Sequence, residues 1–259
     1  MNAIAIGMIS FTCISSGIFV GVVLKRFLPV SHLTNDSRDT IKVGAGAIAS
    51  LTALVIGLLV GSAKTSYDAI DRGVVHFSAK LMHLDRLLMS AGPEADGIRK
   101  DLKQYVIRSK KLIWPEGTSD HQDLPGLARS TQLENIWSRI SELPARTESQ
   151  KQLIQQALHV IDDLKQSRWI MVEESHGSLP IVFLVVLLLW LFLHYLSFSL
   201  IAPNNATTIT VLLVCAISMS SAIFLIMELN SPMHGLIQIS SAPVEKALEV
   251  MDMPLPATP

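Results

Sequence analysis

The stretch that decides the fold is residues 43–91, VGAGAIASLTALVIGLLVGSAKTSYDAIDRGVVHFSAKLMHLDRLLMSA. Its first part, residues 45–63, carries no charged side chain and is long enough to cross a bilayer as a helix. No proline interrupts the stretch, and from Lys64 onward apolar residues recur every three or four positions, as in an amphipathic helix. The sequence therefore predicts one helix that leaves a membrane span and continues into a soluble helical domain.

The membrane part of this helix carries small residues at helical spacing. Small side chains let another helix approach closely in lipid, where packing drives association. We expect such packing from a stripe of five residues: Gly46, Ser50, Ala53, Gly57 and Gly61. If several copies of the helix surround a centre, another face would line the lumen, and the pattern assigns to it Ile48, Thr52, Val55, Leu59 and Ser62. The alternative is that both faces only pack within a bundle.

Charged residues continue the small-residue stripe beyond the apolar part. Lys64, Asp68 and Arg72 follow it at intervals of four residues, a spacing at which opposite charges support a helix. In a channel they would form charged rings at the entrance of a vestibule. The alternative is an ordinary solvated helix surface.

The composition is that of an integral membrane protein. Of the 259 residues 49% are hydrophobic and 17% are charged, and the mean hydropathy is +0.42. The net charge of −1 gives no support for nucleic-acid binding. The lipid bilayer is therefore the first partner that the sequence predicts.

Three further apolar stretches have the length of membrane spans, at residues 3–24, 181–202 and 209–229. The first lacks the basic start and small-residue exit of a cleaved signal peptide, so we expect a retained span. Its glycines and serines indicate tight packing against other helices. The sequence thus predicts an all-α membrane protein with four transmembrane helices in two hairpins.

The predicted domain organisation follows from these spans. Residues 1–63 and 180–229 form the two transmembrane hairpins. Residues 64–179 form a soluble helical domain inserted between spans 2 and 3, and residues 230–259 form a C-terminal amphipathic segment and tail. Within the soluble part, Gly92-Pro93-Glu94 ends one helix and starts the next.

The sequence gives little support for an enzyme. It contains no metal-ligand spacing, no glycine-rich phosphate loop and no nucleophile with an evident base, so we expect no cofactor and no metal. His194 is the ionisable residue deepest within a predicted span, and burial there is costly unless the ring is paired or faces water. It is therefore a candidate intramembrane ionisable site. The alternative is that His194 only reaches the membrane interface.

Several segments together resemble a known family, the bacterial bestrophin-like membrane proteins of the DUF4239 type. They are LTALVIGLLV at 51–60, LDR at 84–86, RW at 168–169, APNNAT at 202–207, ELNSP at 228–232 and GLIQISSAP at 235–243. Bestrophins are pentameric anion channels whose second span lines the pore and whose helical domain is cytosolic. The resemblance implies a homo-oligomer, a tetramer or pentamer, in the bacterial inner membrane, with the soluble domain and both termini in the cytoplasm. The calcium clasp and the aromatic neck of animal bestrophins have no counterpart here.

Two functional hypotheses follow. The first is an oligomeric channel for inorganic ions, anions by family likeness, with the second span lining the pore and the helical domain forming a cytoplasmic vestibule. A cation-selective channel is a variant of it. The second hypothesis is a membrane-anchored helical scaffold or sensor that conducts no ions.

Overall fold

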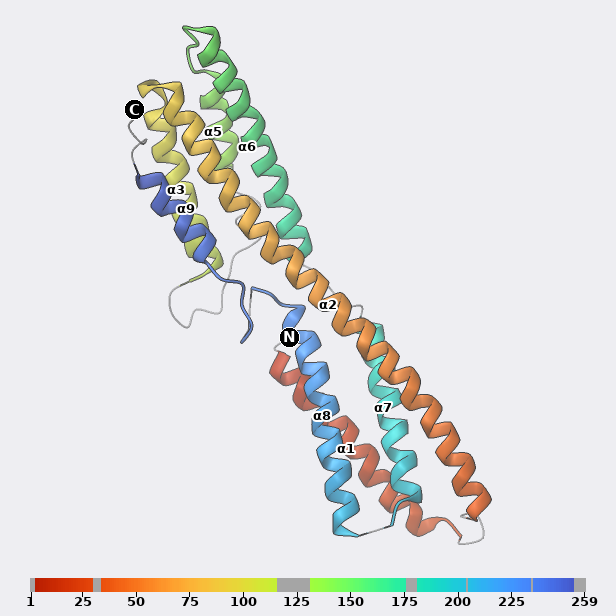
Figure 1. Cartoon of the computed structure of the whole chain (residues 1–259). Coiled ribbons are helices and arrows are strands. Elements are labelled where there is room, and N and C mark those ends of the chain that lie inside the picture. Colours follow the sequence, from red (N-terminus) through yellow and green to blue (C-terminus); the bar gives the residue numbers. More distant parts are fainter. Residues whose placement is uncertain are drawn as a thin grey trace. The chain divides into compact units, whose positions relative to one another are not determined.

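The computed structural model describes residues 3–29, 34–115, 131–175, 181–203, 205–233 and 235–253. Every regular element in these residues is a helix (Figure 1). The helices are, in chain order, α1 (Ala3–Phe27), α2 (Asn35–Ala91), η2 (Pro93–Ala95), α3 (Asp96–Ile113), α5 (Gln132–Ser141), α6 (Glu148–Ser175), α7 (Ile181–Ile201), α8 (Ala206–Leu229) and α9 (Ala242–Asp252). The predicted all-α fold class is confirmed.

The chain divides into two compact units. The first comprises Met1–Tyr67 and Gly177–Ile237, and the second comprises Asp68–His176 and Gln238–Pro259. Within the described residues, four helices are long and apolar enough to cross a membrane, namely α1, α2, α7 and α8. All four supply residues to the first unit, which we call the membrane unit.

Helix α2 is a single unbroken helix, as the sequence predicts, and its 57 residues extend beyond the predicted range of 43–91. It begins before the apolar pattern does, and its first turn is capped by Thr34, whose Oγ1 accepts a hydrogen bond from the backbone N–H of Ser37 at 3.3 Å. It ends at Ala91, and Gly92 follows with a φ of +115°, a conformation that is open to glycine and rarely to other residues. Pro93 follows in the first turn of η2. Local sequence signals thus fix both ends of the longest element.

Helix α1 packs against α7 and α8 in the membrane unit, and glycines permit the close approach. A Cβ atom at Gly17 would lie 2.7 Å from the backbone oxygen of Phe192, and one at Gly21 would lie 2.7 Å from that of Leu196. The Ser199 hydroxyl also donates to the carbonyl of Ile18 at 2.8 Å. The tight packing predicted for the first span is therefore confirmed, and these two glycines face α7.

Helix α2 joins this bundle through one face only. Ala45, Thr52 and Ala63 are buried, and Val55, Ile56 and Leu59 pack against the core formed by α1, α7 and α8. Toward the end of α8, the buried Ile226 and Leu229 meet Ala63 and its neighbours. Of the other residues in the membrane part of α2, Ile48, Ala49 and Val60 are half-buried and the rest are exposed in the single chain.

The second unit contains the remainder of α2 together with α3, α5, α6 and α9. The apolar residues that recur along α2 after Lys64 form a buried face of six residues, Ile70, Val74, Phe77, Leu81, Leu84 and Leu88. Each neighbouring helix buries its own apolar stripe, as expected for a helical bundle. Thr147 opens α6, because its Oγ1 accepts a hydrogen bond from the N–H of Gln150 at 3.1 Å.

The contact between α1 and α7 predicts a difference between two glycine positions. Replacing Gly21 by Ala places a Cβ against the α7 backbone, which cannot yield as a flexible side chain can. We expect Gly21→Ala to destabilise the protein by about 1–3 kcal/mol, measured as a lower melting temperature in detergent. Gly44→Ala is the matched control, because an added Cβ there meets nothing within 4 Å. Equal melting temperatures for the two variants would contradict the close approach.

Candidate functional site

The exposed face of α2 is the first candidate site. The small-residue stripe lies on this side, and Gly46, Gly57 and Gly61 have no atom within 4 Å of an added Cβ. Leu54 and Leu58 stand on the same side, with 61% and 65% of their surfaces exposed. Within the described residues, this face therefore meets no other helix of its own chain. It is free to meet lipid, water or another copy.

The residues that the sequence assigns to a lumen differ in their burial within the single chain. Thr52 is only 3% exposed, and Val55 and Leu59 pack against the buried cluster of the same chain. Ile48 is half-buried, and Ser62 is exposed. A lumen between copies must be lined by residues that the chain's own bundle leaves free. The packing therefore favours the opposite side of the helix, since α2 can bury only one side against α7 and α8.

The three charges that follow the stripe have different surroundings. Lys64 and Arg72 are exposed, and Asp68 is half-buried. The ammonium of Lys64 lies 5.2 Å from the ring centre of Tyr67, within range of a cation–π interaction. Their assignment to a vestibule entrance stays a prediction.

His194 lies half-buried in α7 and reaches α2. Its Nδ1 is 3.1 Å from the carbonyl oxygen of Ala45, and a carbonyl only accepts, so Nδ1 carries the proton. The rings of Tyr195 and Phe198 meet the imidazole edge to face, with centroids at 5.5 and 4.7 Å. His194 thus ties the start of the second span to the third. The hydrogen bond satisfies one polar atom of the ring within the span.

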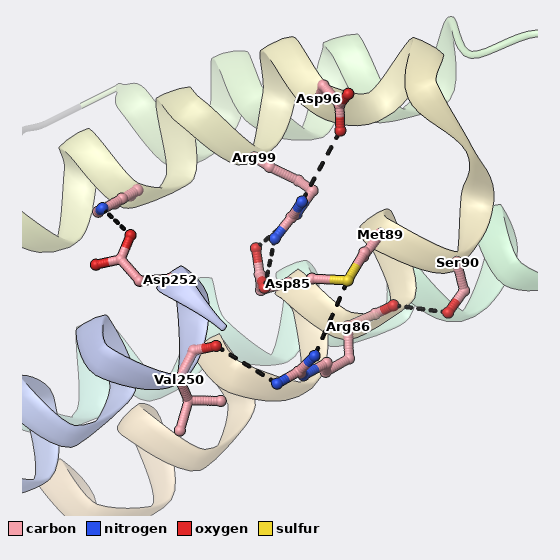
Figure 2. Close-up of polar contacts among 9 residues, drawn as sticks. Asp85, Arg86, Met89, Ser90, Asp96, Arg99, Val250 and Asp252 are labelled. Atoms are coloured by element: carbon pink, nitrogen blue, oxygen red, sulfur yellow. Dashed lines mark hydrogen bonds and ion pairs between the residues drawn. The ribbon is translucent and has the colours of Figure 1, made fainter. Parts of the chain in front are cut away.

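A group of charged side chains in the second unit was not singled out as a site by the sequence pattern. Asp85 of α2 has only 3% of its side chain exposed. It accepts two hydrogen bonds from Arg99 of α3, from Nε at 2.9 Å and from Nη2 at 3.1 Å (Figure 2). This contact raises the pKa of Arg99 above its ordinary value, against the lowering effect of burial. The signal in the sequence is a carboxylate inside the apolar face of α2, between Leu84 and Leu88.

The C-terminal end of α9 reaches the same group. Lys103 of α3 forms an ion pair with Asp252, the last residue of α9. Arg86 lies beside Asp85 in α2, and its Nη2 is 3.5 Å from the carbonyl oxygen of Val250 (Figure 2). Further along α3, Lys110 pairs with Glu245 at 2.8 Å. Polar contacts therefore join α2, α3 and α9.

Arg168 is a second buried charge in this unit, with its side chain 1% exposed. Its Nη2 donates to Glu134 of α5 at 2.9 Å, and its guanidinium lies 5.6 Å from the ring centre of Trp169. Burial raises the pKa of the neighbouring Tyr105 hydroxyl, while the Arg168 charge acts in the opposite direction. These contacts hold α3, α5 and α6 together.

Glu228 is the buried carboxylate of the membrane unit, at the end of α8. It accepts hydrogen bonds from the backbone N–H of Leu236 and, at 3.0 Å, from that of Ile237. Gly235 has a φ of +101°, and a side chain there would collide with the carboxylate. Glu228 therefore holds a turn of the following segment against α8. A carboxylate just before the end of an apolar span is the sequence signal for such a role.

The part of the chain that the structure describes contains no group of three or more His, Cys, Asp and Glu side chains that could hold a metal ion. Arg99 lies among the carboxylates of the α2–α3–α9 group and neutralises the most buried of them. The charges of this group are thus arranged for pairing with one another.

Comparison with known proteins adds a family and a fold. The sequence matches the bestrophin-like domain over residues 12–244. The structure is similar to that of a bacterial bestrophin homologue from Klebsiella pneumoniae with a tryptophan-to-alanine mutation, with a TM-score of 0.68 and 13% identity over 97% of both chains. The structure is also similar to that of an isoleucine-to-threonine mutant of the same homologue. The TM-score is 0.62 and the identity is 13%, over 94% of this chain and 97% of the other. No curated protein matches.

The Asp85–Arg99 pair predicts a large loss of stability on truncation. Asp85→Ala leaves Arg99 without its bidentate partner, and we expect about 3 kcal/mol of destabilisation, measured by thermal unfolding of the solubilised protein. Lys151→Ala is the control, because the Lys151–Glu148 pair is 62% and 75% exposed. Such surface pairs contribute about 0–1 kcal/mol. A small effect of Asp85→Ala, comparable to the control, would show that the pair carries no structural role.

Proposed function

The chain belongs to the bestrophin-like family, and on that premise we propose that it forms an oligomeric ion channel whose pore is lined by the exposed face of α2. The observation that carries this proposal is that α2 buries only one side in its own bundle. A membrane helix with one free face can join copies of itself around a centre. The family and its structural neighbours are ion channels, and in a channel this free face would line the pore.

The composition of the exposed faces supports the assignment to α2. Side chains exposed on α7 include Ile181, Val182, Phe183, Val185, Val186 and Leu189, all bulky and apolar, as expected toward lipid. The exposed side of α2 instead mixes Ser50, Gly57, Gly61 and Thr65 with three leucines, Leu51, Leu54 and Leu58. Small residues allow copies of α2 to lie close together, and hydroxyls can contact partly dehydrated ions.

Leu54 and Leu58 are the proposed constriction. They are exposed and one turn apart, so copies around an axis would form two adjacent apolar rings. Narrow apolar rings gate ion flow by excluding water. The packing stripe Gly46, Ser50, Ala53, Gly57 and Gly61 would then lie between neighbouring copies.

The proposal extends to the rest of the chain by likeness to the family. The second unit would form a cytoplasmic vestibule, with Lys64, Asp68 and Arg72 at its entrance and both termini in the cytoplasm of a bacterial cell. Anions are the proposed permeant ions. Two exposed cations, Lys64 and Arg72, support this preference, since positive side chains at a pore mouth raise the local concentration of anions.

The first test is ion flux through the purified protein in liposomes, with separate chloride and potassium gradients and empty liposomes as the blank. We expect a protein-dependent chloride flux. A potassium flux alone would make the channel cation-selective. Folded oligomers that pass neither ion over a range of pH and voltage would favour a membrane-anchored scaffold.

The second test addresses the pore face. Leu58→Ser replaces an apolar ring by hydroxyls, so water should enter the constriction more easily and flux should rise several-fold. Leu189→Ser is the matched control, because Leu189 is 52% exposed on α7, on the face that we expect to meet lipid. We expect its flux to match the wild type. If the Leu58→Ser and Leu189→Ser variants conducted equally, this result would contradict the assignment of α2 to the pore.

A further inference from the structure

A polar pocket of about 380 Å³ lies in the second unit, between α2, α3 and α9. Its volume is within the range of sites for small molecules. Six charged side chains line it: Asp85, Asp96, Arg99, Lys100, Lys103 and Asp252. This pocket lies outside the α2 face that we assign to the pore, so any ligand of it would act apart from the permeant ion.

The pocket is lined by equal numbers of positively and negatively charged side chains. α3 supplies the three cations, Arg99, Lys100 and Lys103, at positions that share one side of a helix. The three carboxylates come from α2, from the first residue of α3 and from the last residue of α9. A simple anion or a simple cation would therefore meet a like charge wherever it bound.

Arg99 is held so that part of its guanidinium remains available. Nε and Nη2 donate to the two oxygens of Asp85. Nη1 lies 3.8 Å from Asp96, which is too far for a hydrogen bond. Figure 2 shows the guanidinium between these two carboxylates. The buried pair thus fixes the orientation of Arg99 and leaves the donors of Nη1 for a ligand.

Lys100 and Asp252 complete the two halves of the site. Lys100 lines the pocket and forms no ion pair among the residues that the structure describes. Asp252 pairs with Lys103 through one carboxylate oxygen, and its side chain is 63% exposed. The side chain of Asp96 is 60% exposed. The pocket therefore offers accessible donors on α3 and accessible acceptors from the ends of α3 and α9.

We propose that this pocket binds a small zwitterion, a molecule of amino-acid size that carries both a carboxylate and an ammonium group. The carboxylate would be bound by Lys100 and by Nη1 of Arg99. The ammonium would be bound by Asp252, with Asp96 nearby. Each group of the ligand then meets the opposite charge, and the pocket remains neutral when it is filled.

The test compares three probes of equal chain length on the full-length protein in detergent, by isothermal titration calorimetry. The probes are 5-aminopentanoate, pentanoate and pentylamine, at millimolar concentrations. We expect saturable binding of 5-aminopentanoate and at least tenfold weaker binding of the two single-charge probes, since each of these leaves one set of pocket charges unmatched. Equal binding of pentanoate would make this an anion site and would overturn the proposal, as would the absence of saturable binding by 5-aminopentanoate.

Two lysine variants locate the binding. Lys100→Gln removes a cation that has no ion pair within the described part of the chain, so the fold should be retained and 5-aminopentanoate should bind about tenfold more weakly. Lys111→Gln is the control, because this lysine is exposed on α3 and does not line the pocket. An equal effect of the two substitutions would overturn the assignment. The measurement does not depend on conduction, so it stands apart from the outcome of the flux tests.

Discussion

The membrane unit depends on the close approach of α1 to α7. In lipid the hydrophobic effect does not drive helices together, so association requires backbones that come near enough for extensive van der Waals contact. Gly17 and Gly21 provide that approach, because any side chain there would collide with backbone carbonyls of α7. The α1–α7 contact, completed by α8, forms the core against which α2 packs with a single face. The free face of α2 is a consequence of this arrangement.

The second unit depends on charge pairing as well as on apolar burial. Asp85 and Arg168 are both buried, and each has a partner of opposite charge on another helix. An unpaired charge at either place would be costly, so these pairs fix how α3 lies on α2 and how α6 lies on α5. The Asp85–Arg99 pair also orients a guanidinium toward the polar pocket. One interaction thus has a structural role and supplies part of the proposed binding site.

Much of the fold could be predicted from local patterns. The unbroken course of α2, its stop before Gly92, the apolar face from Ile70 to Leu88 and the opening of α6 at Thr147 all follow from residues close together in the chain. The lumen-facing set is where pattern and packing differ, since Thr52, Val55 and Leu59 lie against the chain's own bundle. Nearly every residue of that span is apolar or small, so periodicity could not show which side is buried.

The sequence by itself determined the membrane class, the helical spans and the amphipathic bundle, because hydrophobic length, helical period and the positions of proline and glycine are local properties of the chain. The family is also carried by sequence, over residues 12–244. Only the tertiary structure decided which face of α2 is free and which charges meet. The hydrogen bond of His194 to Ala45, the packing of Gly21 on Leu196 and the contact of Lys103 with Asp252 each join residues more than a hundred positions apart. Such contacts depend on how helices pack, and a local pattern contains no information about a partner so distant in the chain.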